Sequence, residues 1–118
     1  MPSLGMQGPY KLESGTIDMI VPRTHPGNYA IGYRRDSGAG AFVVRYIGRA
    51  DSDLNRELKS QASDGLSWFK WCYAPSEKIA FDKECKNYHD FGESRKLENE
   101  GHPVAPNGTN WKCPVCNR

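Results

Sequence analysis

The pattern of hydrophobic and polar positions predicts a short helix near the N-terminus. Ile17, Ile20 and Val21 recur at helical spacing, and Thr16 stands before them as an N-cap residue. Pro22 ends the pattern, because proline lacks a backbone donor and clashes with the preceding turn. We therefore expect a helix between these two residues.

A second helix is predicted to begin after an N-cap at Asp51 or Ser52. Leu54 and Leu58 share one face of this helix and form its buried stripe. Arg56 lies two residues from each leucine, which places it about 200° around the helix axis from both. Its side chain should therefore face solvent or a cleft and not the core.

A third helix is predicted between Ser76, which acts as N-cap, and a stop at Gly92. The helix carries Glu84, Cys85 and His89. Cys85 and His89 are spaced i, i+4, so both side chains project from the same face. This helix should therefore present a thiol and an imidazole side by side.

Three segments have the composition of strands. Residues 29–33 and 41–47 are rich in β-branched and aromatic side chains, and the cluster 36–40 between them contains the glycines of a turn. Together they predict an antiparallel hairpin. The aromatic segment 67–73 predicts a third strand.

Composition limits the chain to one small domain. Of its 118 residues, 37% are hydrophobic and 25% are charged, which is typical of a globular protein with a modest core. We predict the α/β (α+β) class, with a three-stranded antiparallel sheet flanked by helices and closed by a C-terminal zinc knuckle. The expected organisation is an irregular arm at 1–13, a domain at 14–92, and a loop with the knuckle at 93–118 packed on that domain.

Net charge by itself does not identify a partner. The chain has 16 basic and 14 acidic residues, so its formal charge of +2 gives only a weak attraction to polyanions. No apolar run approaches the roughly 18 residues of a membrane-spanning helix, and the first residues do not resemble a secretion signal. We expect a soluble, cytoplasmic protein with no membrane partner.

Two of the four cysteines, Cys113 and Cys116, form a Cys-Pro-Val-Cys turn near the C-terminus. In a chain without a secretion signal, this spacing favours metal binding over disulfide bonds. Two thiolates on one tight turn can occupy two corners of a tetrahedron around zinc, at about 2.3 Å from the metal. The turn therefore predicts a structural zinc site.

Two further zinc ligands must come from elsewhere in the chain. Cys85 and His89 can complete a Cys3His set from one face of the third helix. His102 is an alternative to His89, and Cys72 is an alternative to Cys85. The position of Cys72 among aromatic residues on a strand favours the core. The predicted zinc ligands are Cys85, His89, Cys113 and Cys116.

Another group of residues has the chemistry of a hydrolytic site. A tyrosine hydroxyl, at Tyr29 or Tyr46, can act as a general base or pass on a proton if a neighbouring cation such as Arg49 or Arg56 lowers its pKa. Glu84 lies on a partly apolar helix face. Its carboxylate should therefore either pair with an arginine or hold a hard cation.

These residues resemble the GIY-YIG nuclease family over residues 27–89. The Gly-Asn-Tyr sequence at 27–29 looks like the first half of the family signature. The Tyr-Ile-Gly sequence at 46–48 matches the second half letter for letter. The two tyrosines, Tyr29 and Tyr46, are 17 positions apart (46 minus 29), which is longer than is usual in the family.

The resemblance extends into the two longer helices. Arg56 follows Tyr46 by ten positions, where the family places its catalytic arginine, and residues 79–84 resemble the helix that presents the metal-binding glutamate, here Glu84. Four positions after this arginine the family often has histidine or tyrosine, and this chain has Ser60. The serine removes a candidate proton handler.

The resemblance implies hydrolysis of a DNA phosphodiester by a water molecule that is activated through a tyrosine, Tyr29 or Tyr46. Arg56, assisted by Arg49, would stabilise charge on the phosphate, and Glu84 would hold a single Mg²⁺ or Mn²⁺. Oxygen ligands suit such hard cations. The implied partner is DNA, reached alone or through a partner protein or separate DNA-binding module.

A second interpretation keeps the fold without full catalysis. In this interpretation the chain is a catalytically weak or inactive zinc-stabilised module that binds nucleic acid or a protein. Ser60 favours this alternative, whereas the combination of Arg56 with Glu84 favours the endonuclease.

Overall fold

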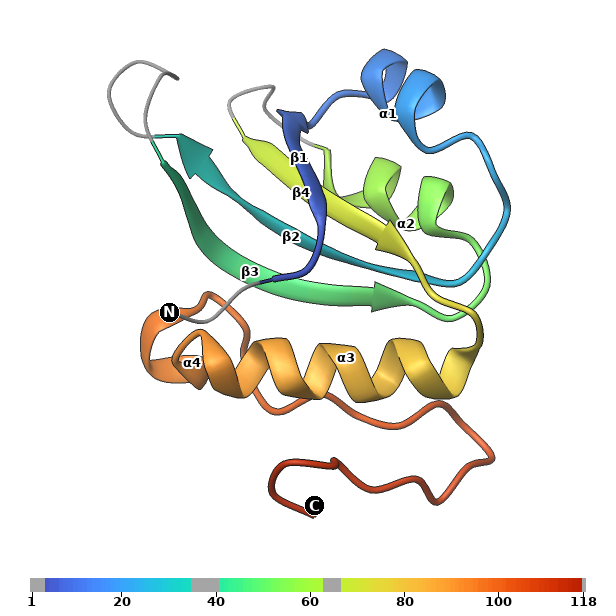
Figure 1. The fold of residues 1–118 in the computed structure, drawn as a ribbon, viewed down its shortest axis with the longest axis vertical. Coiled ribbons are helices and arrows are strands. Elements are labelled where there is room, and N and C mark those ends of the chain that lie inside the picture. Colours follow the sequence, from blue (N-terminus) through green and yellow to red (C-terminus); the bar gives the residue numbers. More distant parts are fainter. Residues whose placement is uncertain (1–3, 35–40, 63–66, 118) are drawn as a thin grey trace.

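The computed structural model describes residues 4–34, 41–62 and 67–117. Within these ranges the strands form one antiparallel sheet, and helices cover both of its faces (Figure 1). The predicted turn at 36–40 lies outside the described residues. In chain order the elements are β1 (Gln7–Lys11), α1 (Ser14–Ile20), β2 (Gly27–Arg34), β3 (Phe42–Ala50), α2 (Leu54–Gln61), β4 (Trp68–Tyr73), α3 (Glu77–Asp90) and α4 (Glu93–Lys96).

The sheet has four strands in the order β1-β4-β2-β3. Strand β2 lies in the interior, where it pairs with β3 on one side and β4 on the other. Tyr29 on β2 therefore lies opposite both Gly48 of β3 and Trp71 of β4. The predicted hairpin and third strand are confirmed as antiparallel neighbours.

Two hydrophobic clusters hold the helices on the sheet. On the face of α1 and α2, Leu54 and Leu58 are fully buried, as their spacing predicted. They pack with Tyr29 and the side chains of β4, and each buried leucine contributes about 2 kcal/mol. On the opposite face, which α3 covers in Figure 1, Ile47 and Tyr88 belong to the second cluster.

The prediction of three strands is wrong, because β1 forms part of the segment expected to be an irregular arm. Its residues Gln7, Tyr10 and Lys11 pair with β4, and the register shifts between the first two. The strand was not predicted because the segment contains Gly8 and Pro9, which both disfavour regular strand structure. Backbone pairing with a distant strand compensates for this weak local preference.

The helix caps were predicted with mixed success. Ser76 caps α3 as predicted, because its hydroxyl accepts a hydrogen bond from the backbone N–H of Ile79 at 3.2 Å. The N-cap of α2 is Asp53, one or two residues later than expected, and its carboxylate accepts from the N–H of Arg56. Thr16 lies inside α1, and its hydroxyl donates to the Glu13 carboxylate at 3.2 Å.

After α4 the chain first follows the outer edge of β3 and then the outer side of α3 (Figure 1). The Asn99 side chain pairs with the backbone of β3. Its oxygen accepts a hydrogen bond from the Ile47 N–H at 3.0 Å, and its amide donates to the Ile47 carbonyl at 2.8 Å. Farther on, Cys113 and Trp111 pack against Phe81 and Cys85 of α3. These contacts attach the C-terminal segment to the sheet edge and to α3.

Candidate metal centre and catalytic cluster

Helix α3 and the C-terminal segment bring two histidines and two cysteines together. The donor atoms of His89, His102, Cys113 and Cys116 all lie within 4.8 Å of one another. Nitrogen and sulfur donors in this number suit a tetrahedral metal site, and zinc is the metal most often bound by such a set. This His2Cys2 group can hold a metal ion.

Hydrogen bonds orient both imidazole rings toward the centre of the group. The Nδ1 atom of His89 lies 2.7 Å from a carboxylate oxygen of Glu93, and that of His102 lies 2.7 Å from the carbonyl oxygen of Pro103. Both partners are acceptors, so each Nδ1 carries the proton. In the neutral rings each Nε2 therefore presents a lone pair, the form that binds a metal.

The Nε2 atoms of His89 and His102 are 3.2 Å apart. At this distance the two nitrogens can share a metal ion, or a proton on one ring can be donated to the other. A tetrahedral zinc with Zn–N bonds of about 2.0 to 2.1 Å separates such nitrogens by about 3.3 Å. The spacing therefore matches a shared metal.

The turn that carries the two cysteines stabilises a thiolate. Burial raises the pKa of Cys113, but hydrogen bonds from the backbone N–H groups of Cys116 and Val115 outweigh it and lower the pKa to about 7. The two N–H groups lie 3.5 and 3.4 Å from the Cys113 sulfur. A thiolate is the form in which cysteine binds zinc.

Cys85, expected as a ligand, is placed beside the His2Cys2 group and not among its four members. Its side chain is fully buried and hydrogen-bonded to Cys113. Burial is the largest cause of the strongly raised pKa of Cys85, followed by the interaction with Cys113, and both favour the neutral thiol. His102, which was the alternative to His89, belongs to the same group as His89. Cys72 is half-buried on β4, outside the group.

A second polar cluster surrounds Arg49 at the end of β3. Its guanidinium donates to Glu84 at 2.6 Å and to Asp51 at 2.7 Å, and it lies 5.3 Å from the centre of the Phe81 ring. Burial raises the pKa of Glu84, and the attraction of Arg49 only partly opposes this shift. The sequence predicted an arginine partner or a cation for Glu84, and the structure shows the arginine.

Tyr29 and Tyr46 lie side by side, with ring centres 6.2 Å apart. The Tyr29 hydroxyl is buried and donates to a carboxylate oxygen of Glu57 at 2.9 Å. Burial first, and then the negative charge of Glu57, raise the pKa of Tyr29 far above its ordinary value. Gly48 makes this position possible, because a Cβ atom there would lie 2.5 Å from the hydroxyl oxygen.

Arg56 is exposed on α2, as predicted from its angular position. It lines a hollow of about 250 Å³ together with Arg49, Glu57 and Ser60. The Ser60 hydroxyl donates to the backbone carbonyl of Glu57 at 2.6 Å. Two guanidinium groups thus border one open hollow, together with the carboxylates of Asp51, Asp53 and Glu57.

Tyr46 and Glu84 line a different hollow, of about 390 Å³, together with residues 98–103. Glu100 and His102 belong to this segment. Carboxylate and hydroxyl oxygens line this hollow, whereas the His2Cys2 group offers nitrogen and sulfur donors. The Arg49–Glu84 ion pair thus joins a lining residue of one hollow to a lining residue of the other.

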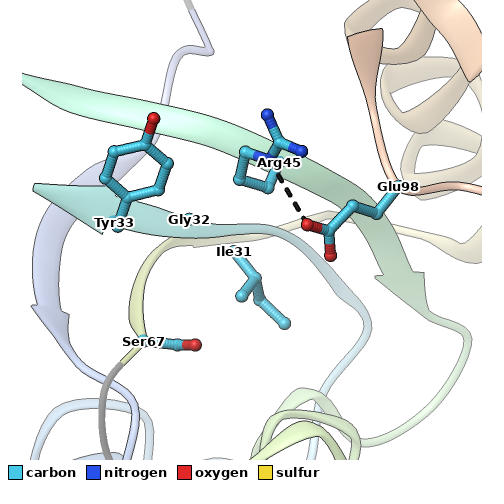
Figure 2. A pocket seen from close by; sticks show the side chains of 6 residues that line it. All are labelled: Ile31, Gly32, Tyr33, Arg45, Ser67 and Glu98. Atoms are coloured by element: carbon cyan, nitrogen blue, oxygen red, sulfur yellow. Dashed lines mark hydrogen bonds and ion pairs between the residues drawn. The ribbon is translucent and has the colours of Figure 1, made fainter. Parts of the chain in front are cut away.

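The largest described hollow, of about 480 Å³, lies elsewhere on β2 and β3. Figure 2 shows the Arg45 and Glu98 side chains pointing toward each other, and their ion pair is 3.3 Å long. Ile31, Tyr33 and Ser67 complete much of its wall. The pair neutralises its own charge, and this hollow contains none of the predicted site residues.

Comparisons with protein families, with curated proteins and with solved structures gave no match. Among the described residues, no helix is long and apolar enough to cross a membrane.

Proposed function

We propose that the protein is an endonuclease of GIY-YIG type, which hydrolyses DNA phosphodiester bonds and depends on a divalent cation. The observation that supports this proposal is the convergence of five side chains from four elements. Arg49 forms an ion pair with Glu84, Tyr46 stacks on Tyr29, and the ion pair joins a residue that lines one hollow to a residue that lines the other. Arg56 borders the first of these hollows.

The positive side chains would bind the scissile phosphate. Arg56 is exposed, and its guanidinium can therefore meet a phosphate without first losing a buried partner. Arg49 is held in place by Asp51 and Glu84, so its charge is preorganised next to the same hollow. Fixed cations stabilise the extra negative charge that develops when water attacks phosphorus.

The two tyrosines have different places in this mechanism. Tyr46 is half-buried and lines the hollow next to Glu84, so its hydroxyl can contact the attacking water. Tyr29 is buried behind it and cannot reach a substrate directly. The direct proton acceptor from water is therefore Tyr46, and Tyr29 acts through it.

Glu84 would hold a Mg²⁺ or Mn²⁺ ion in the hollow that it shares with Tyr46. Bound there, the ion would supply positive charge next to the leaving oxygen. One Glu84 oxygen is engaged by Arg49, which leaves the second oxygen for a cation. An oxygen donor is the ligand type that both metals prefer.

Zinc in the His2Cys2 group completes the proposal as a structural metal. Four protein donors leave no open position for substrate or water, as in other structural zinc sites. Zinc would attach the C-terminal segment to α3 through His89, and α3 also carries Glu84. The ion thereby stabilises the helix that presents the catalytic carboxylate.

The test is nicking of supercoiled plasmid DNA in the presence of Mg²⁺ or Mn²⁺. We expect the wild-type protein to convert the plasmid to open circles, and Glu84→Ala to lose this activity by at least about 100-fold. Glu77→Ala removes an exposed carboxylate from the same helix and is the matched control. Equal nicking by wild-type protein and Glu84→Ala would refute the endonuclease proposal.

The alternative function is a weak or inactive binding module with the same zinc-stabilised fold. Two observations favour it: Arg49 already neutralises Glu84, and the Ser60 hydroxyl is bonded to the backbone. This alternative predicts binding of DNA, or of a protein partner, without metal-dependent cleavage. Gel-shift experiments with uncleaved DNA under the same conditions separate the two functions.

A further inference from the structure

Strand β4 buries one of its two faces and leaves part of the other accessible. Phe69 and Trp71 are buried on the side of α1 and α2, whereas Trp68 and Lys70, which alternate with them, are only half-buried. Successive residues of a strand point to opposite faces, so Trp68 and Lys70 lie on the side of α3. In Figure 1 the start of β4 and the end of β2 lie well away from α3. The helix therefore does not cover these two side chains.

Residues of the other three strands join Trp68 and Lys70 on this face. Residues that lie directly opposite each other in an antiparallel pair point the same way. Lys11 of β1 lies opposite Trp68, and Arg34 of β2 lies opposite Phe42 of β3. These five residues, Lys11, Arg34, Phe42, Trp68 and Lys70, form what we call the basic-aromatic face.

Cations and aromatic rings are paired on the basic-aromatic face. The Arg34 guanidinium lies 5.0 Å from the centre of the Trp68 ring, and the Lys70 ammonium lies 5.6 Å from the centre of the Phe42 ring. Such contacts hold a cation in place without neutralising it, because the ring has no net charge. The face therefore presents fixed positive charge beside aromatic surfaces.

Carboxylates do not balance the positive charge of this face. Within the described residues, Lys11, Arg34 and Lys70 belong to no ion pair. The positions of β2 opposite Lys70 and Trp68 are Ala30 and Gly32, which carry no charge. The whole chain has a formal charge of only +2, so the cations are concentrated locally. Such a concentration attracts a polyanion.

A single strand of DNA matches both components of the basic-aromatic face. Its phosphates can pair with the cations, and its unpaired bases can stack on aromatic rings and on guanidinium planes. A duplex offers the same phosphates but keeps its bases stacked on one another. An acidic peptide would use the cations and leave the rings without a partner. The combination of charge and rings thus favours a single strand.

We propose that the basic-aromatic face binds a single-stranded segment of DNA, with phosphates on Lys11, Arg34 and Lys70 and bases stacked against Trp68 and Arg34. The choice of DNA rests on the proposed endonuclease function, whereas binding of a single strand does not require cleavage. Phe42 and Arg49 are seven positions apart on β3 (49 minus 42), which is roughly 23 Å at about 3.3 Å per residue. The face is therefore a second contact with DNA, separate from the phosphate that would be cut.

Fluorescence anisotropy with a labelled strand tests this proposal. The probe is a fluorescein-labelled thymidine oligonucleotide of about 15 nucleotides, because binding sites for single strands cover about 4 to 16 nucleotides. The buffer contains no Mg²⁺ or Mn²⁺, so binding is measured without metal-dependent cleavage. We expect the full chain to bind the probe with an affinity that falls as salt rises.

Two variants remove the two components of the face separately. Trp68→Leu removes the stacking surface and keeps an apolar side chain, and it should weaken binding by about 10-fold, within the range that stacking of one base contributes. Lys70→Gln removes one cation. It should weaken binding by about 4-fold at about 0.15 M salt and lower the slope of log affinity against log salt by about 0.7, the value for one phosphate of a single strand.

The matched control is Lys78→Gln. Lys78 also lies over an aromatic ring, 5.9 Å from the centre of Trp111, but it belongs to α3. This variant changes the net charge by the same amount as Lys70→Gln, so it should bind the probe as wild type does. A duplex of the same length is the second control. Neither Trp68→Leu nor Lys70→Gln should change its affinity as much as that of the single strand.

Each outcome decides the proposal. Selective loss of single-strand binding in Trp68→Leu and Lys70→Gln would support it. Wild-type protein that does not bind the probe, or variants that bind it like Lys78→Gln, would overturn it. Equal losses for duplex and single strand would show a charge effect alone and also overturn it. If Trp68→Leu does not fold, Lys70→Gln still tests the face, because it replaces a half-buried polar side chain.

Two further results separate the partner and the activity. A uridine oligoribonucleotide that binds more tightly than the thymidine strand would overturn the assignment to DNA. If the protein nicks plasmid DNA but does not bind the probe, the endonuclease stands and the binding face is wrong. If the probe binds through Trp68 and Lys70 but no nicking occurs, the endonuclease proposal fails and the binding face stands.

Discussion

The His2Cys2 group and the Arg49–Glu84 cluster are neighbours on α3 but differ in how their charges are balanced. In the His2Cys2 group, the Nε2 atoms of two imidazoles are 3.2 Å apart, and backbone N–H groups lower the pKa of Cys113. These four donors can hold a metal ion. In the other cluster, Glu84 and Arg49 neutralise each other at 2.6 Å. One region therefore offers its donors to a cation, whereas the other pairs its charges within the protein.

This difference has a consequence for stability. If the group holds a metal, loss of that metal should loosen the first region, because the ion would join α3 to the C-terminal segment. It should leave the side-chain pairing of the second region intact unless α3 itself loosens. The variants below test that contrast, in order of decreasing effect.

The largest effect is expected for removal of zinc. Cys116→Ser should bind less than one equivalent of zinc and lose on the order of 5 kcal/mol of unfolding free energy, because the energy of metal binding is energy of folding. Metal analysis and thermal unfolding measure the two quantities. Full zinc content in this variant would contradict the assigned ligands.

The same variant also tests the coupling between the two regions. Because His89 and Glu84 share α3, Cys116→Ser should raise amide exchange around Glu84 as well as in the C-terminal segment. If only residues after Gly92 exchange faster, the metal stabilises the tail without the helix.

The next effect is expected at the ion pair. Arg49→Met leaves Glu84 buried without its cation and should cost about 3 kcal/mol of unfolding free energy, because both side chains are 11% exposed. The double variant Arg49→Met, Glu84→Gln removes the uncompensated charge and should regain part of that loss. Urea unfolding measures both variants. Equal stability of single and double variants would show that charge is not the cause.

A smaller effect is expected at alkaline pH. The pKa of Tyr29 is raised above its unfolded value of 10.0, so the folded state keeps a proton that the unfolded state releases. The contribution of Tyr29 is therefore complete below pH 10 and is lost as the pH rises, by up to about 1.4 kcal/mol per pH unit. In Tyr29→Phe, stability should fall less steeply with pH. Urea midpoints measured between about pH 9.5 and about pH 11.5, a range that spans the ordinary tyrosine pKa of about 10, test this. An unchanged slope would mean that Tyr29 ionises normally.

The smallest effect distinguishes the helices that serve the two regions. Asp53→Ala removes the cap of α2, which carries Arg56 and Glu57, and should cost about 1 kcal/mol. Zinc affinity should not change, because α2 contributes no member of the His2Cys2 group. Chelator competition measures the affinity. A weaker zinc affinity in this variant would show that the two regions are coupled through the sheet.

The sequence by itself determined the features that depend on neighbours in the chain. The Ser76 cap, the stop before Gly92 and the shared face of Leu54 and Leu58 follow from local backbone chemistry and helical spacing. The Cys113 turn likewise contains its own hydrogen-bond donors. Each of these was predicted because the groups involved lie within a few positions of each other.

Only the tertiary structure decided which distant residues meet. Strand β1 exists because β4 supplies its backbone partners, and the local Gly-Pro sequence gives no sign of it. His102 lies next to His89, and Cys85 lies outside the His2Cys2 group. Both positions depend on the path of the segment after α4, which Asn99 attaches to β3. Glu57 reaches Tyr29 across 28 positions of sequence. Such contacts depend on how whole elements pack, and neither helical spacing nor residue preference encodes that packing.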